Sequence, residues 1–591
     1  MPDHYVEMSE QEMSDQISLN HWLTAPRPGH GLHIAAGPGE WSYHPYAELA
    51  TESLRTAQRI LAAGVRPGSV IVLAVGDPLQ FTTAFFGVLA AGCTPSPLAT
   101  PATFGNDERY LEHAANIICV SGCTAIVFDD LLARYAREAS ERVGSGPVLV
   151  SSQDSGSGAE ATAPLPLPDL ALLQYTSGSS GAPKGVRVSV GNLVSTIAAQ
   201  RDWLGLTPDD VFAQWVPLYH DMGLITMVHN VVLQNSLYLM APQDFLRDPL
   251  SWLRLLGRGL ATATSAPSFG YAYAAKRVRP EQLEGLDFSR WRVAILGAER
   301  IDPTGMGRFG RLLSPFGFDP SALVAAYGMA EATLAVTGVT PGTGTVIREV
   351  DSPVIAEGTP VKFGDAGVLG VDQPATGTWL TGCGAAVPGM SVDIIDEQGA
   401  ELAEGYLGQI RVRGTAVAQG YQGDVAPGRF TAKGYETGDA GIIVDGTLFV
   451  VGRIGDSLKI RGAAVHAEDL ELEIATELGV TPNRVVVLLG TADLVDLAVV
   501  ILACGDREID PRPIATLLRS RTAESVALAI VRGAPDAIER TSSGKPRRRV
   551  LWRSVLAGEL RGEVVHSTWG EVSGKPAPWD SEMRSEDGGP R

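Results

Sequence analysis

A glycine- and hydroxyl-rich stretch constrains this chain more than any other feature. Residues 175–187 read Y-T-S-G-S-S-G-A-P-K-G-V-R and lie between two apolar runs. Glycines let backbone N–H groups approach a polyphosphate, hydroxyls donate hydrogen bonds to its oxygens, and a lysine adds a mobile positive charge. The stretch therefore predicts a loop that binds the β- and γ-phosphates of a nucleotide. A Ser/Gly linker has a similar composition but seldom lies between apolar strands.

The spacing of this loop differs from the Walker pattern, in which Gly-Lys-Ser/Thr ends the loop. Here the lysine follows Pro183 and precedes Gly185, which argues against a P-loop kinase or GTPase. The candidate phosphate-binding residues are Thr176, Ser177, Gly178, Ser179, Ser180, Gly181 and Lys184.

Length and charge narrow the class of protein. A chain of 591 residues has room for two or more domains. Its net charge of −20 argues against a nucleic-acid partner or an anionic membrane surface, and no apolar run is long enough for a membrane span. Residues 1–16 are acidic and polar, so we expect a disordered lead-in and no signal peptide.

The cysteines are odd in number and scattered among apolar residues. Cys119 and Cys123 resemble half of a metal site, but no second Cys/His pair completes four ligands. We expect buried free thiols in a reducing cytoplasm. The five are Cys93, Cys119, Cys123, Cys383 and Cys504.

The order of predicted elements indicates an α/β protein. Strands and helices alternate through most of the chain, residues 340–370 lack periodicity, and short alternating strands follow residue 392. We predict a large N-terminal domain of several subdomains, at residues 17–453, with two mixed or parallel sheets covered by helices and a small β-barrel-like subdomain. A small α+β domain at 454–566 and a disordered tail at 567–591 complete the chain.

Two further stretches have side chains suited to a nucleoside. Residues 327–331 read Y-G-M-A-E, where the aromatic ring of Tyr327 can stack on a purine and the carboxylate of Glu331 can hold Mg²⁺. A helix cap gives the same pattern. Residues 435–439 read Y-E-T-G-D, and the carboxylate of Asp439 can accept both ribose hydroxyls, although Gly-Asp is also a plain hairpin turn.

Two charged stretches flank or lie within the small domain. Residues 452–462 carry several charges at the predicted domain change, where a solvated linker is the simpler interpretation. Residues 541–549 place Lys545 at the tip of a glycine-containing loop, although a basic surface tail would look the same.

In their order and spacing, these five stretches resemble the adenylate-forming superfamily of acyl-CoA synthetases, peptide-synthetase adenylation domains and firefly luciferase. The resemblance covers residues 30–560, and within the superfamily the chain is most similar to fatty acyl-AMP ligases. The finer similarity lies in residues 215–225, 265–269 and 327–334, and in an irregular region at 340–370, followed by Gly-Cys-Gly at 382–384, where those ligases carry an insertion.

The resemblance implies ATP and Mg²⁺ as cofactors and a role for each matching residue. Residues 176–184 would hold the β- and γ-phosphates, Glu331 the Mg²⁺, and Lys545 would bridge the substrate carboxylate and the α-phosphate. Gly455 would be the hinge of a mobile small domain. The adenosine would be held by Gly297, Ala298, Glu299, Tyr327, Gly328, Met329, Ala330, Asp439 and Arg453.

The acyl pocket is the least defined part of the predicted site. The resemblance places His220 at its mouth and Phe269, Tyr271 and Tyr273 among its wall residues. Alternatively, His220 is a core histidine bonded to Asp221.

Several positions depart from the family pattern. Gly455 stands where the superfamily commonly has Asp or Lys, and glycine still permits a large change of φ and ψ. Leu296 and Arg300 stand where the ligases often have Asn and Pro, and the run A-A-V-H at 463–466 replaces an Asn-His-Tyr-Pro-like sequence. We therefore expect an altered carrier-protein contact and an acid other than a plain long-chain fatty acid.

The resemblance predicts a ligase that converts a carboxylic acid to its acyl-AMP and passes the acyl group to an acyl carrier protein. CoA as acceptor remains an alternative, as does an atypical acid or an amine acceptor in specialised metabolism. A catalytically dead nucleotide-binding scaffold is disfavoured, because Lys545, Glu331 and Asp439 are all present.

Overall fold

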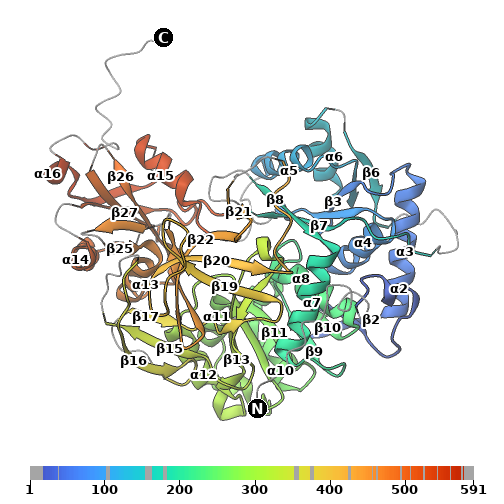
Figure 1. Ribbon diagram of the computed structural model, residues 1–591, viewed down its shortest axis with the longest axis horizontal. Coiled ribbons are helices and arrows are strands. Elements are labelled where there is room, and N and C mark those ends of the chain that lie inside the picture. The colour runs from blue at the N-terminus through green and yellow to red at the C-terminus, as the bar shows by residue number, and fades with distance from the viewer. Residues whose placement is uncertain are drawn as a thin grey trace, which may run out of the picture.

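The computed structural model describes most of the chain (Figure 1). The described residues are 17–37, 39–101, 107–144, 146–153, 163–176, 183–351, 358–372, 378–423, 428–454, 457–460, 463–492, 495–505, 507–522, 526–541, 544–559, 561–573 and 577. The predicted phosphate-binding residues Ser177, Gly178, Ser179, Ser180 and Gly181, and the predicted hinge Gly455, lie outside this part of the chain.

A nine-stranded sheet forms the centre of the large domain. Its six inner neighbours, from β1 to β13, pair in parallel, and β2, β14 and β18 add antiparallel edges. In sheet order the strands are β18 (Ala385–Ala386), β14 (Ala335–Gly338), β13 (Leu323–Gly328), β12 (Val293–Gly297), β11 (Ala263–Pro267), β9 (Val211–Gln214), β10 (Ser236–Leu239), β1 (Gly31–Gly37) and β2 (Glu40–Pro45).

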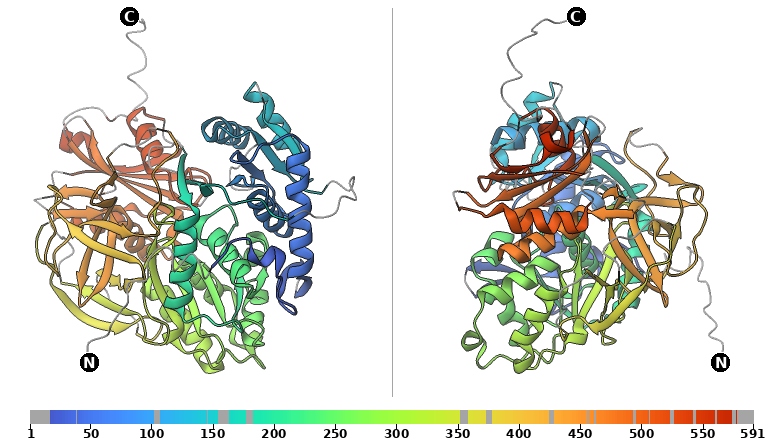
Figure 2. Two further views of the ribbon diagram at one scale, coloured as in Figure 1. Left: turned by 45° about the vertical axis from the view of Figure 1, so that its right-hand side comes forward. Right: turned by 90° about the vertical axis from the view of Figure 1, so that its left-hand side faces the viewer.

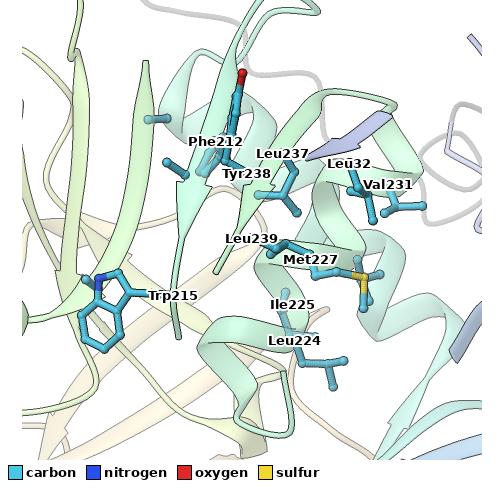
Figure 3. Packing of buried hydrophobic residues seen from close by; sticks show 14 of the residues in the cluster. Leu32, Phe212, Trp215, Leu224, Ile225, Met227, Val231, Leu237, Tyr238 and Leu239 are labelled. Carbon is cyan, nitrogen blue, oxygen red and sulfur yellow. The ribbon is translucent and has the colours of Figure 1, made fainter. Parts of the chain in front are cut away.

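Helices cover this sheet and bury its apolar strands. Figure 3 shows side chains of β9 and β10, among them Phe212 and Leu237, beside Leu224 and Met227 of the helix α8. Parallel strands with covered faces consist of near-continuous apolar residues, as β12 does. The helices of this part are α2 (His21–Thr24), α7 (Val190–Leu204), α8 (Asp221–Leu233), α9 (Pro242–Arg247), α10 (Pro249–Gly257), α11 (Ser268–Arg277) and α12 (Pro303–Leu313).

A second, parallel sheet of four strands forms the N-terminal part of the large domain. Its order is β4 (Thr94–Pro97), β3 (Val70–Ala74), β5 (Ala125–Phe128) and β6 (Val148–Ser151). Its helices are α3 (Tyr46–Ala62), α4 (Pro78–Ala90), α5 (Asp107–Ser121) and α6 (Ala133–Arg142).

The β-rich subdomain is larger than the sequence pattern predicts. The region 340–370 contains two strands, which form a three-stranded sheet with a third, so the prediction of an irregular region is wrong here. Gly and Pro mask a period of two in such short strands. The strands are β15 (Val346–Val350), β16 (Phe363–Val368), β17 (Thr378–Thr381), β19 (Met390–Ile395), β20 (Gly408–Gly414), β21 (Phe430–Thr431), β22 (Gly434–Val444) and β23 (Thr447–Arg453).

The small domain is a four-stranded sheet with helices on both faces. Leu470 and Ile514 pack on one face, and Leu551 and Val555 on the other. After a hairpin of β24 (Ser457–Ile460) and β25 (Ala463–His466), the elements are α13 (Ala467–Leu478), β26 (Val485–Ala492), β27 (Val495–Ala503), α14 (Pro511–Arg521), β28 (Ala527–Gly533), α15 (Arg548–Leu556), β29 (Glu563–Ser567) and α16 (Trp569–Ser573). In Figure 1 this domain lies beside the β-rich subdomain.

Residues 567–573 correct the predicted boundary of the tail. They finish β29 and form α16, and Trp569 is only 1% exposed within the core of the small domain. The sequence around Trp569 is polar, so average composition predicts disorder although this one large apolar side chain is buried in the core.

Three expectations about the whole chain can be compared with the structure. No described helix is both long and apolar enough to cross a bilayer. The five cysteines are unpaired, as predicted, but Cys119 is exposed and only Cys93 and Cys383 are buried. Among the described residues, no cluster of three or more His, Cys, Asp or Glu side chains could hold a metal.

Replacement of Trp569 tests the revised boundary. Trp569→Ala should lower the free energy of unfolding of the small domain by about 3–5 kcal/mol, because it removes a fully buried ring. Leu556→Ala is the matched control, since Leu556 is 45% exposed, and should change stability by about 0.5 kcal/mol or less. Urea unfolding followed by circular dichroism measures both, and equal midpoints would contradict the burial of Trp569.

Candidate active site

The predicted phosphate loop is the tip of a β-hairpin. Strands β7 (Leu170–Thr176) and β8 (Lys184–Ser189) are antiparallel, and Thr176 pairs directly with Lys184 across the base of the loop. Gly185 is needed for close packing, because a Cβ there would lie 3.0 Å from the Tyr175 ring. The hairpin therefore holds Thr176 and Lys184, the two residues that flank the loop, next to each other.

The outer edge of β8 pairs with a segment from the β-rich subdomain. Gln422 donates its backbone N–H to Gly185, and the N–H of Arg187 bonds to the carbonyl of Gly420. This pairing brings Tyr421, which the sequence analysis did not single out, to the base of the loop. The Lys184 Nζ lies 5.2 Å from the centre of the Tyr421 ring.

Tyr421 connects the lysine to the predicted metal ligand. Its hydroxyl donates to the Glu331 carboxylate at 2.7 Å and lies 3.1 Å from the hydroxyl of Tyr435. Burial and the neighbouring Glu331 raise the pKa of Tyr421 well above its usual value, so it remains a hydrogen-bond donor. Burial and then the charge of Arg429 lower the pKa of Lys184.

These contacts suit a magnesium polyphosphate. Mg²⁺ is commonly held by one or two carboxylates together with phosphate oxygens, so Glu331 fits the ion without a complete protein cage. Lys184 lies near the Tyr421 ring, and its positive charge would suit the phosphates themselves.

A second group of side chains forms around Asp439. One of its carboxylate oxygens accepts from the Tyr327 hydroxyl at 2.7 Å, and the other lies 3.0 Å from Nε of Arg453. Burial, then the charge of Asp439, raise the pKa of Tyr327. Tyr327 is the last residue but one of β13, and Arg453 ends β23, so the group joins the central sheet to the β-rich subdomain.

The structure does not support the hairpin-turn alternative for Asp439. This residue lies inside β22, directly opposite Arg453 on β23. Gly438 interrupts the strand with a φ of +74°, a conformation that residues with a side chain rarely adopt. A Cβ at this position would also lie 2.5 Å from Arg429. The Y-G-M-A-E segment also needs its glycine, because a Cβ on Gly328 would lie 2.0 Å from the Leu334 carbonyl oxygen. Met329 and Ala330 follow, and a short 3₁₀ turn (Ala330–Ala332) carries Glu331.

The third segment follows β12 directly. Ala298 has a φ of +66°, a conformation that non-glycine residues adopt only where the surrounding structure imposes it. Gly297 is equally constrained, because a Cβ would lie 3.2 Å from Met222. The next residue, Glu299, accepts the backbone N–H of Phe269 at 2.6 Å, at the first turn of α11.

Lys545 is presented by a closed turn of the small domain. The N–H of Thr541 bonds to the Lys545 carbonyl, and the N–H of Arg547 bonds to the Glu539 carbonyl, both at 2.8 Å. The positive charge of Lys545 stabilises the carboxylates of Asp221 and Glu299. The structure thus brings Lys545 toward the large domain, at the side where these two acids lie.

The two acids respond differently to their surroundings. Desolvation raises the pKa of Glu299 to about 7 although the residue keeps contact with solvent, and the Phe269 N–H and the charge of Lys545 oppose this shift. For Asp221, burial would raise the pKa, but the charge of His220 and its other partners outweigh burial and leave it below the usual value.

His220 has features of both interpretations offered for it. Its Nδ1 lies 2.6 Å from the Asp221 carboxylate, as the alternative reading expects. It is nevertheless not a core residue, since its side chain is 22% exposed and it forms the N-cap position of α8. It therefore lies on the same side of the molecule as the acids that sense Lys545.

The three aromatic residues predicted for the acyl pocket have separate locations. Phe269 is 46% exposed and packs edge-on against Trp215, a residue with no predicted role of its own. Tyr273 is partly buried and donates its hydroxyl to the Leu246 carbonyl. Tyr271 is completely buried and donates to the Ile295 carbonyl, so we leave it out of the proposed pocket.

Comparison with known proteins agrees with this site. Residues 25–422 match the model of the AMP-binding enzyme family. The chain belongs to the AMP-binding enzyme family. Members of the family are adenylate-forming ligases that use ATP, and their fold matches the sheets described above.

Individual members of the AMP-binding family are similar over most of the chain. A Caulobacter vibrioides protein with the provisional name acyl-CoA synthetase is 32% identical, over 87% of this chain and 90% of its own length. The 4-hydroxyphenylalkanoate adenylyltransferase of Mycobacterium tuberculosis is 31% identical, over 86% and 84%. A solved structure from a study of fatty acyl-adenylate ligases of E. coli and L. pneumophila has a TM-score of 0.80 and 28% identity, over 91% of this chain and 98% of that one.

The position of Lys545 can be tested through its effect on Glu299. Lys545→Ala should raise the pKa of Glu299 further above its value of about 7, because removing a nearby positive charge destabilises the carboxylate. Lys545→Arg keeps the charge and should leave the pKa unchanged. ¹³C NMR titration of labelled glutamate carboxyls, assigned with Glu299→Gln, measures the shift. A Glu299 pKa that is identical in the alanine variant and the parent would place Lys545 elsewhere.

Proposed function

We propose that this enzyme uses ATP and Mg²⁺ to convert a carboxylic acid, fatty or related, to its acyl-AMP with release of pyrophosphate. The acyl group then passes to the phosphopantetheine thiol of an acyl carrier protein. The observation that carries the proposal is that each of three groups of side chains joins residues from distant parts of the chain. They are the Lys184–Tyr421–Glu331 contacts, the Tyr327–Asp439–Arg453 contacts, and Lys545 close to Asp221 and Glu299.

The charges in these groups match the difficulty of the reaction. The oxygen of the acid's carboxylate forms a bond to the α-phosphorus while the bond to the pyrophosphate oxygen breaks, so an anion attacks an anion. Lys545 would lie between the two, and its positive charge would reduce their repulsion. Mg²⁺ would supply further charge neutralisation on the phosphates, next to Glu331.

The residues of the site would divide the substrates among them. Lys184 and the loop that it closes would hold the leaving pyrophosphate. Asp439 would accept the ribose hydroxyls, and Arg453 would keep that carboxylate oriented. The exposed face of Phe269 and the side chain of His220 would border the substrate's acyl group. Phe269 contacts Glu299 and His220 contacts Asp221, the two carboxylates that the charge of Lys545 stabilises.

The acceptor and the acid are the open parts of the proposal. A relative from Teredinibacter turnerae that is named as a medium-chain-fatty-acid–[acyl-carrier-protein] ligase supports a carrier protein as acceptor. CoA is the second candidate, because the Caulobacter relative bears the name of an acyl-CoA synthetase. The mycobacterial relative's name argues that hydroxyphenyl-alkanoic acids be tested beside fatty acids.

An adenylation assay on a panel of acids tests the first half-reaction. We expect ATP- and Mg²⁺-dependent pyrophosphate release with one class among fatty, aryl and amino acids. Lys545→Ala should lower this rate by about 10²- to 10³-fold while ATP binding persists, because the lysine acts on charge that develops during the reaction. Lys433→Ala removes an exposed lysine of the β-rich subdomain and should retain the parent rate. Failure to form an adenylate from any acid would refute the proposed function.

The same assay identifies the acceptor. The enzyme is given the purified adenylate together with CoA or with a holo acyl carrier protein, and the thioester that forms is measured by mass spectrometry. We expect the carrier protein to be acylated faster than CoA. Equal or faster formation of the CoA thioester would favour the second candidate.

Gly455 provides a test of the proposed rotation between half-reactions. Gly455→Pro should leave adenylation near the parent rate and lower thioester formation about tenfold or more, because proline fixes φ where a hinge must change it. Gly455→Ala is the control and should retain most of the transfer rate. Single-turnover kinetics of each half-reaction separate the two effects, and an equal loss of both would argue against a hinge at this residue.

A further inference from the structure

Two ion pairs join the small domain to separate parts of the large domain. Nη2 of Arg109, on α5, lies 2.8 Å from the Glu539 carboxylate. The guanidinium of Arg300, which follows β12, pairs with the Asp469 carboxylate in the first turn of α13. In the right-hand view of Figure 2, α13 lies between the sheet of the small domain and the helices of the large domain.

The first pair acts on the turn that carries Lys545. The Glu539 carbonyl accepts the N–H of Arg547 and closes this turn. The Glu539 side chain is 15% exposed and also lies 3.5 Å from Arg547 and 3.8 Å from Arg561. Two cations of the small domain therefore hold the Glu539 carboxylate in place. Arg109 binds this carboxylate at the base of the turn that carries Lys545.

The second pair acts on the segment that carries Glu299. Arg300 is the next residue, and its side chain also bonds to the carbonyl of Trp379 at 3.4 Å. The side chains of Arg300 and Asp469 are 16% and 19% exposed, so separating them would leave two poorly solvated charges.

We propose that Arg109 and Arg300 are positioning residues that together lock the small domain in the orientation in which Lys545 serves adenylation. This inference rests on the proposed function. Two separate contacts constrain the orientation of the small domain more than one contact does, because a single contact leaves it free to turn about that point. Rotation of the small domain for thiol transfer would break both pairs, so the lock favours the first half-reaction over the second.

The lock predicts an effect on orientation that needs no substrate. Donor and acceptor dyes on unnatural amino acids at Glu141 and Ser520, which are exposed on α6 and α14, report the distance between the domains. We expect Arg109→Ala to increase the population of undocked molecules about tenfold in single-molecule fluorescence transfer. Arg142→Ala is the matched control, because it removes two 2.8 Å contacts within the large domain, from α6 to Glu108, which is the neighbour of Arg109 on α5. A docked population equal to that of the parent and the control would overturn the proposal.

Charge exchange distinguishes an ion pair from general destabilisation. Arg300→Asp alone should undock the small domain and lower the adenylation kcat about tenfold with an unchanged KM for ATP. Adding Asp469→Arg restores the opposite charges and should recover docking in large part. No recovery in the double variant would overturn the role of this pair. If the parent forms no adenylate, the proposed function fails, while the fluorescence result still decides whether the lock exists.

Discussion

The antiparallel pairing of β22 with β23 determines much of what this protein can do. It places Asp439 opposite Arg453, and the resulting ion pair keeps a carboxylate available where the Tyr327 hydroxyl reaches it from the central sheet. Arg453 is also the last residue of β23, immediately before the connection to the small domain. One interaction therefore belongs both to the nucleoside-binding group and to the boundary between the domains.

A second pairing has a similar effect on the phosphate side. Because β8 pairs with residues 419–422, the hairpin that holds Lys184 is attached to the β-rich subdomain and not only to its own neighbours. The hydroxyl of Tyr421 then fixes the Glu331 carboxylate. Backbone pairing thus sets the positions of side chains that are more than 200 residues apart, and no single motif carries the site.

The sequence predicted elements and chemistry better than it predicted partners. Buried strands such as β9 and helices such as α13 follow from the sequence itself, because a continuous apolar run or a helical period specifies them locally. Asp439 was predicted to bind the ribose, and that role stays a prediction; its place inside a strand depends on the partner strand. Arg109 and Glu539 are 430 residues apart, and both are residue types that are common on protein surfaces. No local sequence pattern therefore predicts their contact. The anchoring of residues 567–573 similarly depends on one tryptophan.

The closed turn around Lys545 has a mechanical consequence. Since backbone hydrogen bonds join the two arms of this turn and Glu539 anchors its base, the lysine moves with the small domain as a whole and little by itself. Any rotation of the small domain therefore moves the Lys545 ammonium group with it. Small rotations at the far end of the domain would be enough to withdraw that charge, which makes the reaction sensitive to forces applied well away from the site.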